Sequence, residues 1–290
     1  MFFPLFYLLF FFLSTSPSAR AADARQIFDH SEWDQFLKEF VNEKGDLDYR
    51  AAKQKPEHLL SYLEKVKSIP EEQLKEWPRE EKISIFVNTY NAAVVKLILD
   101  HHPLKSIIEI PGVWDNAVVL IATPLQTQKP QAYSLNQIRR YLLMQKFRDE
   151  KILFALCAGA KGSPPLQREA YTTPRLEGQL YLVTRKFAND PARNQIVPGE
   201  KKIVLSRIFK WYGPDFLLNW GDFPDQPRWN VEEKAVLSFF AHYLDDAKKV
   251  EFLKEGTYKI KYESFDWGLN DLPAAKGQRV KGLDNSPAPS

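Results

Sequence analysis

The sequence predicts an α+β fold, built as a single mainly helical domain around a small β-sheet. Helical patterns of apolar residues are interleaved with a few short strand patterns along the chain. No linker rich in Gly, Pro or Ser divides residues 22–272. Because 44% of the 290 residues are apolar, the chain can bury one substantial core. We therefore expect one domain over residues 22–272, followed by a disordered tail over 273–290.

The first 21 residues are read as a signal peptide and are set aside from the fold. Phe2 to Leu13 is an apolar run of signal-peptide length, and Ala19-Arg20-Ala21 offers small residues for cleavage. An uncleaved anchor is the alternative, but this run is too short for a ~30 Å hydrocarbon core, and we expect no later segment to be long enough. We expect a periplasmic or secreted protein with no stable membrane insertion after signal removal.

Composition argues against several classes of partner. The net charge is only +3, from 40 basic and 37 acidic residues spread along the chain, so we expect no nucleic-acid partner. Cys157 is the only cysteine, which rules out an intramolecular disulfide. His101 and His102 are adjacent on a helix and therefore point in different directions, and no HExxH or CxxC motif is present. We expect neither a metal site nor a cofactor.

The first half of the mature chain is predicted to be helical. Ser31 is expected to cap an amphipathic helix that ends near Gly45, and a second helix stops before Pro70. A longer helix follows Pro78 and runs to His101. Its predicted buried stripe consists of Ile83, Phe86, Val87, Tyr90, Val94, Leu97 and Ile98.

Short strands alternate with helices in the second half. We expect strands over 118–121, 203–205 and 258–262, where apolar residues run together or alternate. Ser134 and Ser206 are expected to cap helices, the second of them unusually aromatic. Further helices are predicted over 174–187 and 231–243.

The stretch KILFALCAGAKGSPPLQREAY, residues 151–171, is the first candidate for a site. Its apolar run from Ile152 to Leu156 predicts a strand covered on both faces. Glycines and the pair Pro164-Pro165 then make a stiff loop that holds Ser163. A turn that only connects a strand to a helix is the plainer alternative.

Amides interrupt the apolar pattern of the long helix. Asn88 and Asn91 cost helix propensity unless their hydrogen bonds are used, so something should bond to them. They are expected either to tie the helix to neighbouring loops or to contact a ligand directly. The candidate ligand-binding residues are Asn88, Tyr90, Asn91, Trp114, Arg168, Tyr171 and Tyr212.

Four motifs in order resemble the domain of unknown function 547 family. They are FVNTYNAAVVKLILDHHPLKSI, KILFALCAGAKGSPPLQREAY, LSRIFKWYGPDF and FDWGLND, and the resemblance covers about Ser31 to Leu272. The family contains exported bacterial proteins and plant proteins, and this chain resembles the exported bacterial branch. The resemblance implies no established reaction.

The chain departs from that family's pattern at the positions whose side chains a reaction would require. The positions of Leu153, Ala158 and Ser163 are often His, Cys and Cys in the family, and this chain lacks that histidine and both thiols. A thiolate nucleophile near neutral pH needs such a base. Cys157 lies one residue out of place and is read as a core residue.

Three functions stay open at this point. We favour a ligand-binding or catalytically degenerate family member that holds a small polar ligand or an envelope component. The alternative is an enzyme of hydrolase or acyl-transfer type that uses Ser163 or Cys157 with His242 as its base. A structural envelope protein that acts through surface contacts is the third, and no sequence feature points to it.

Overall fold

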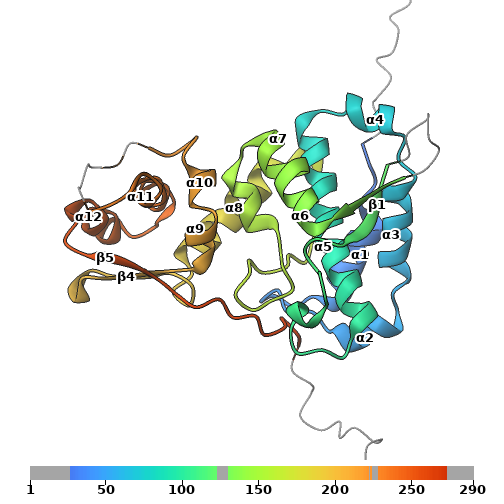
Figure 1. Cartoon of the computed structure of the whole chain (residues 1–290), viewed down its shortest axis with the longest axis horizontal. Coiled ribbons are helices and arrows are strands. Elements are labelled where there is room, and N and C mark those ends of the chain that lie inside the picture. Colours follow the sequence, from blue (N-terminus) through green and yellow to red (C-terminus); the bar gives the residue numbers. More distant parts are fainter. Residues whose placement is uncertain (1–26, 123–129, 222, 224–227, 273–290) are drawn as a thin grey trace, which may run out of the picture.

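The computed structural model describes residues 27–122, 130–221, 223 and 228–272. The predicted signal peptide and the predicted disordered tail lie outside the described residues. The described chain is mainly helical with two small sheets, which confirms the α+β class. Figure 1 shows helices α1 to α5 with β1 at one end of the longest axis, and the three-stranded sheet with α11 and α12 at the other.

Helix α5 (Arg79–His101) is the structural centre of the first half. It follows Pro78, carries Glu80 and Glu81 in its first turn, and is buried along most of its length. Helices α2, α3 and α8, strand β1 and helix η2 all pack against it. The predicted bounds of this helix are confirmed.

Length and composition alone would allow α5 to cross a membrane. The expectation that no segment after residue 21 is long enough was therefore wrong. However, 83% of its most apolar stretch is buried inside the protein, as in a core helix.

Four short helices precede α5 in the chain. The first one begins at Ser31 rather than after it, because His30 is the N-cap residue and the Ser31 hydroxyl donates to Asp29. Its Trp33, Phe36, Leu37 and Phe40 face the core. The four elements are α1 (Ser31–Phe40), α2 (Tyr49–Gln54), α3 (Glu57–Lys67) and α4 (Glu71–Glu76), of which α2 and α4 were not predicted.

The strands form two separate sheets. Strands β1 (Ala117–Ile121) and β2 (Gln131–Ser134) pair antiparallel. In the second sheet, β3 (Gln195–Val197) pairs antiparallel with β4 (Lys202–Leu205), which pairs parallel with β5 (Lys259–Tyr262). The strands expected at 118–121, 203–205 and 258–262 are confirmed, whereas β2 and β3 were not predicted.

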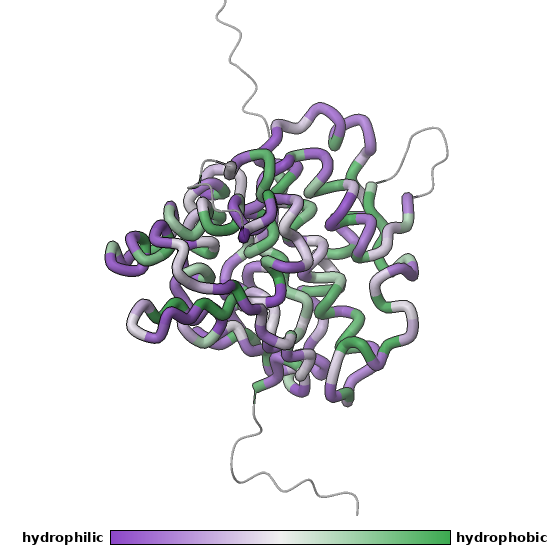
Figure 2. The backbone as a smooth tube through the Cα atoms, turned by 60° about the vertical axis from the view of Figure 1, so that its left-hand side comes forward, coloured by the Kyte–Doolittle hydropathy of each residue, from purple (hydrophilic) through white to green (hydrophobic). Residues whose placement is uncertain are grey.

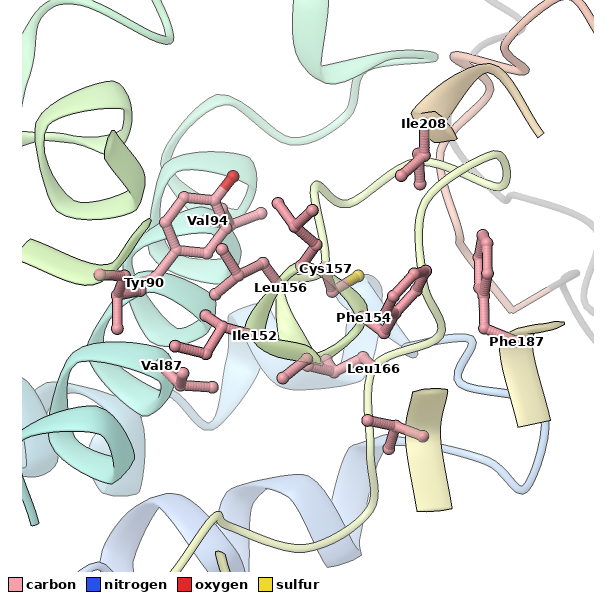
Figure 3. Packing of buried hydrophobic residues seen from close by; sticks show 14 of the residues in the cluster. Val87, Tyr90, Val94, Ile152, Phe154, Leu156, Cys157, Leu166, Phe187 and Ile208 are labelled. Atoms are coloured by element: carbon pink, nitrogen blue, oxygen red, sulfur yellow. The ribbon is translucent and has the colours of Figure 1, made fainter. Parts of the chain in front are cut away.

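The buried strand expected at 152–156 is wrong, because Glu150–Ala155 forms a 3-10 helix, η3. The Asp149 carboxylate caps it by accepting from the Lys151 N–H. An uninterrupted apolar run does not distinguish a doubly covered strand from a short buried helix. Figure 3 shows this segment among apolar side chains, with Phe154 facing Phe187 at a ring distance of 5.1 Å.

The second half of the chain is built on packed phenylalanines. Phe209 contacts Phe154, Phe187, Phe216 and Phe240 with ring distances between 4.7 and 6.1 Å. Figure 2 shows hydrophobic and hydrophilic residues alternating along the helices, as expected when one face is buried. The helices here are α8 (Leu176–Asn189), α9 (Arg207–Trp211), α10 (Gly213–Phe216), α11 (Val231–Tyr243) and α12 (Ala247–Glu255).

A π-helix lies between the halves. Ser134 caps α6 (Leu135–Gln137) in a capping box, as predicted, and the chain continues as the π-helix η2 (Ile138–Met144) and α7 (Gln145–Phe147). Such wide turns are frequent at functional sites. This one carries Arg139.

Candidate functional site

A cavity of about 250 Å³ lies where the two halves of the chain meet. The first half supplies Tyr90 from α5, Trp114 from a loop and Arg139 from η2, and the second half supplies α9 and the closing segment near residue 266. The loop after η3 contributes Ser163 and Pro164. Pockets for drug-sized ligands measure about 300–1,000 Å³, so this cavity suits a smaller molecule.

Aromatic side chains make up much of the wall. Phe265 lies 4.4 Å from Trp267 and 5.0 Å from Trp211 between ring centroids, and Trp114 lies 6.0 Å from Trp267. Trp211 is 45% exposed, although it packs against its neighbours. These rings form a mutually supported surface for a flat or apolar ligand face. The six aromatic residues of the wall are Tyr90, Trp114, Trp211, Tyr212, Phe265 and Trp267.

Arg139 is the charged side chain of the cavity. Its guanidinium carbon lies 4.7 Å from the centre of the Tyr212 ring, and its Nη2 donates to Asn136 Oδ1 at 3.3 Å. Within the described residues, no carboxylate forms an ion pair with it. Arg139 is thus held in place by a ring and an amide while most of its donors stay available.

Burial affects the titratable groups near Arg139. It raises the pKa of Tyr90 and of Tyr212, so both phenols stay protonated at neutral pH. Burial also raises the pKa of Asp215, while the nearby charge of Arg139 opposes that shift. The cationic Arg139 is therefore flanked by neutral hydroxyl groups, with the Asp215 carboxyl close enough to interact with its charge.

The two helix amides hold the central stretch in place. Asn88 donates to the Tyr171 carbonyl at 2.7 Å and accepts from the Tyr171 N–H at 3.0 Å. Asn91 donates to the Ala155 carbonyl and accepts from the Cys157 N–H, both at 2.9 Å. Of the two roles considered for these amides, the structure shows the network that ties the helix to a loop, since neither side chain lines the cavity.

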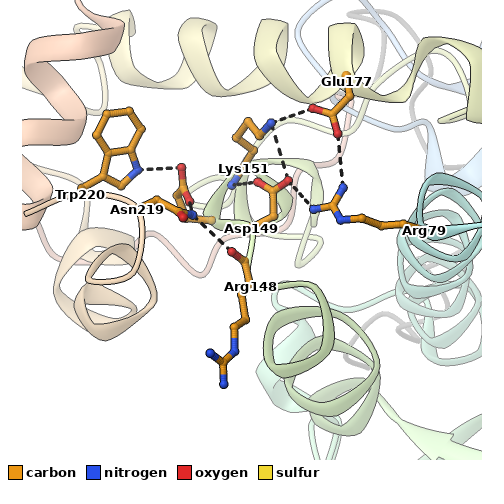
Figure 4. A network of polar contacts seen from close by, with 8 residues as sticks. Arg79, Arg148, Asp149, Lys151, Glu177, Asn219 and Trp220 are labelled. Atoms are coloured by element: carbon orange, nitrogen blue, oxygen red, sulfur yellow. Dashed lines mark hydrogen bonds and ion pairs between the residues drawn. The ribbon is translucent and has the colours of Figure 1, made fainter.

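Polar contacts also anchor the start of η3 (Figure 4). Arg79 Nη2 pairs with Asp149 Oδ2 at 3.0 Å, and Lys151 bridges Asp149 and Glu177. Glu150 is buried and accepts from Trp220 Nε1 at 2.7 Å. These contacts make the segment that leads into the cavity wall rigid from its first residue.

The catalytic candidates do not form a reactive arrangement. The Ser163 hydroxyl donates to the Ala160 carbonyl at 2.6 Å, and its oxygen lies 3.6 Å from Cys157 Sγ. Cys157 is only 3% exposed, and burial raises the pKa of its thiol. His242 lines a different cavity, where its ring lies 5.1 Å from Trp220. No imidazole is among the described residues that line the aromatic cavity.

The predicted ligand-binding residues separate into three groups. Tyr90, Trp114 and Tyr212 line the cavity. Asn88, Asn91 and Tyr171 lie behind it in the buried network. Arg168 is exposed, pairs with Glu43 and lines a third cavity.

Several cavity residues were not named from the sequence. Trp211 lies in the helix described only as aromatic, and Phe265 and Trp267 lie in the motif FDWGLND, which was used only for the family resemblance. Arg139 and Asn136 gave no sequence signal. In the described ranges, no group of three or more His, Cys, Asp or Glu side chains is placed to hold a metal ion.

The middle of the chain matches a known protein family model. Residues 74–188 match the family model described as "Protein of unknown function, DUF547". This segment is similar to the DUF547 family. The DUF547 segment contains α5, Arg139 and the loop that holds Ser163, and it ends before α9 and the closing aromatic segment. No curated protein and no solved structure matches the chain.

Proposed function

We propose that this protein binds a small ligand carrying an anionic group and a flat ring face, in the aromatic cavity. One observation supports this most directly: Arg139 enters the cavity without a carboxylate partner in the described part of the chain. An arginine in a partly buried site that forms no ion pair can bind an anion from outside. The surrounding rings would cover the rest of such a ligand.

The geometry of Arg139 favours a carboxylate or phosphate ligand. Its guanidinium is planar, carries five N–H donors and lies over the Tyr212 ring, which restricts its orientation. Such a preordered donor set loses little entropy when it forms two parallel hydrogen bonds. The protonated phenols of Tyr90 and Tyr212 add neutral donors that do not repel the anion.

Binding is supported better than hydrolysis or acyl transfer. A serine nucleophile needs a general base, but the Ser163 hydroxyl donates to a backbone carbonyl, and no lining residue in the described chain is a histidine or carboxylate. The buried Cys157 thiol, with its raised pKa, is poorly suited to form a thiolate. We therefore propose a ligand-binding family member without this chemistry.

Matched variants would test the binding role. Isothermal titration of the mature chain against benzoate, phenyl phosphate, glucuronate and the neutral sugar glucose compares ring ligands with and without charge. Arg139→Gln should abolish the preference for the charged probes, while Arg140→Gln, on the exposed neighbour, should leave it intact. No binding of any charged probe, or equal loss in both variants, would refute the proposal.

We also propose that the protein is exported and meets its ligand in the cell envelope or outside the cell, as expected for an exported bacterial branch of the family. The apolar run Phe2 to Leu13 and the small residues of Ala19-Arg20-Ala21 support this. N-terminal sequencing of the protein produced in a bacterial host, with cell fractionation, tests it. A cytoplasmic product that retains Met1 to Ala21 would contradict export.

A further inference from the structure

A second cavity, of about 260 Å³, adjoins the aromatic cavity. The same three segments of chain line both. Gly162 faces the second cavity and Ser163 the first, Arg207 the second and Ile208 the first, while Phe265 borders both. Since neighbouring residues alternate between the two hollows, the cavities share one thin wall.

Backbone hydrogen bonds hold this shared wall. The Lys161 N–H donates to the Gly268 carbonyl at 2.8 Å, and the Gly162 N–H donates to the Asp266 carbonyl at 2.9 Å. A Cβ on Gly162 would lie 2.8 Å from the Asp266 nitrogen, so the two segments approach more closely than a side chain allows. The relative position of the two hollows is therefore fixed by the main chain.

The second cavity is polar, and its charges balance. It is lined by Lys161, Arg193, Arg207, Asp190, Glu263 and Asp266. Only Arg193 and Asp190 pair with each other, at 3.0 Å; the other four form no ion pair within the described residues.

Glu263 and Asp266 each accept one hydrogen bond, from Gln195 Nε2 and the Gly268 N–H, and Arg207 Nε donates to the Glu263 carbonyl. The donors and acceptors that these four side chains have left suit hydroxyl groups, which both donate and accept. They do not suit a chain of phosphates, because the carboxylates of Glu263 and Asp266 would repel it.

The two surfaces differ in the kind of ring that they would accept. The C–H bonds on a sugar ring face are weakly positive and pack against the negative faces of tryptophan rings. The aromatic cavity offers such faces next to Arg139, whereas the polar cavity offers hydrogen bonds on several sides. Each hollow has room for about one ring.

Building on the proposed function, we propose that the cavities are adjoining subsites for an acidic oligosaccharide. A sugar ring would lie against the tryptophans with its carboxylate on Arg139, and the next, neutral ring would enter the polar cavity. The ligand class is thus a chain in which a uronic-acid type sugar is linked to an uncharged sugar. No covalent step is involved.

Titration calorimetry with matched sugars tests this assignment. The probes are glucuronate, the disaccharide of glucuronate and N-acetylglucosamine, and uridine diphosphate as an anionic nucleotide. The disaccharide should bind roughly tenfold tighter than glucuronate, which corresponds to about one net hydrogen bond. Arg139→Gln should weaken both sugars.

Substitutions in the polar cavity test the second subsite separately. Glu263→Gln combined with Asp266→Asn keeps the shapes of both side chains and should bring the disaccharide back to the affinity of glucuronate, with glucuronate itself unchanged. Glu200→Gln, on an exposed residue outside both cavities, is the matched control and should change neither.

Failure of this inference is distinguishable from failure of the proposed function. If glucuronate and the disaccharide bind with equal affinity and both depend on Arg139, the second subsite is refuted. The proposed binding role is then still supported. Tighter binding of uridine diphosphate than of either sugar would replace the sugar assignment with a nucleotide. If benzoate and phenyl phosphate bind through Arg139 but neither sugar does, the sugar class is wrong, and if nothing binds, both proposals are wrong.

Discussion

The side chain of Asn91 in the long helix accepts a hydrogen bond from the backbone N–H of Cys157, with 2.9 Å between the nitrogen and Oδ1. In a sheet, a neighbouring strand would accept this bond. The same amide donates to the Ala155 carbonyl, also at 2.9 Å, so that one side chain satisfies two main-chain groups around a turn. Ala155 and Cys157 are both buried, so their main-chain groups need hydrogen-bond partners within the protein.

Replacing this amide should destabilise the fold. Asn91→Ala leaves a buried N–H and a buried carbonyl without partners, and we expect the free energy of unfolding to fall by about 2–4 kcal/mol. Urea denaturation measures this, with Lys96→Ala on an exposed part of the same helix as the control. A loss below about 0.5 kcal/mol would mean that water or the loop itself replaces the amide.

The buried His30 should make the protein less stable in mild acid. Burial lowers its pKa from 6.5 to about 4, while the nearby Asp29 and Asp34 charges only partly oppose this. Because the folded pKa lies below the unfolded one, the stabilising contribution is complete above pH 6.5 and is lost as the pH falls to about 4. The difference of about 2.5 pH units corresponds to roughly 3 kcal/mol.

The measurement compares urea unfolding of the wild type with that of His30→Gln between pH 7 and pH 4.5. The carboxylates titrate in both proteins, so the difference between the two profiles reports His30. We expect the variant to have the flatter profile in this window. Parallel profiles would show that His30 has an unshifted pKa in the folded protein.

Two glycines provide opposite predictions for the same substitution. Gly159 has a φ of +68°, and a Cβ there would lie 2.4 Å from Ile98 Cδ1, so Gly159→Ala should cost about 2 kcal/mol or more. Gly178 lies in α8 with open space around it, so Gly178→Ala should stabilise by about 0.5–1 kcal/mol. Thermal unfolding of both variants checks the pair, and shifts of the same sign would contradict this explanation.

The contact between Glu150 and Trp220 should show measurable coupling. Trp220→Phe removes the N–H that donates to the buried carboxylate at 2.7 Å, with an expected loss of about 1.5–3 kcal/mol. In the double-mutant cycle with Glu150→Gln, the second change should cost less once the tryptophan is gone. Strict additivity of the two losses would mean that the contact is not formed in solution.

Cys157 should react slowly with thiol reagents in the folded protein. It is almost fully covered, and burial raises the pKa of the thiol. Iodoacetamide labelling at pH 8 should therefore be at least about 100-fold slower than in denaturant, because reaction requires local opening. Similar labelling rates in the folded and denatured protein would contradict this prediction and support a reactive thiol.

Secondary structure was predicted correctly where the hydrophobic pattern extends over many residues and the helix ends carry common capping signals. The helix at 79–101 has a proline before it and an apolar stripe along its length, and three strands lie where apolar residues run together or alternate. The run at 152–156 was assigned wrongly because burial on all sides removes the periodic signal. Short helices such as α2 and α4 carry too few residues for a pattern.

The site was only partly predictable for a related reason. Tyr90, Trp114 and Tyr212 could be proposed because isolated aromatics near polar residues are conspicuous. Arg139 is one of 40 basic residues, and nothing local to it shows that its neighbours supply no counter-ion. The second cavity depends on which segments the fold brings together, which no local pattern records.

The aromatic residues of the cavity come from distant parts of the chain, and this limits which fragments of the protein can keep the cavity intact. A fragment that stops at residue 188 would retain Tyr90, Trp114 and Arg139, but it would lack Trp211 and Trp267. Such a truncation would expose the guanidinium and half of an apolar shell to water. Expression of the matched segment alone should therefore yield an incomplete, aggregation-prone product. Ligand screening requires a protein that also contains residues 189–272.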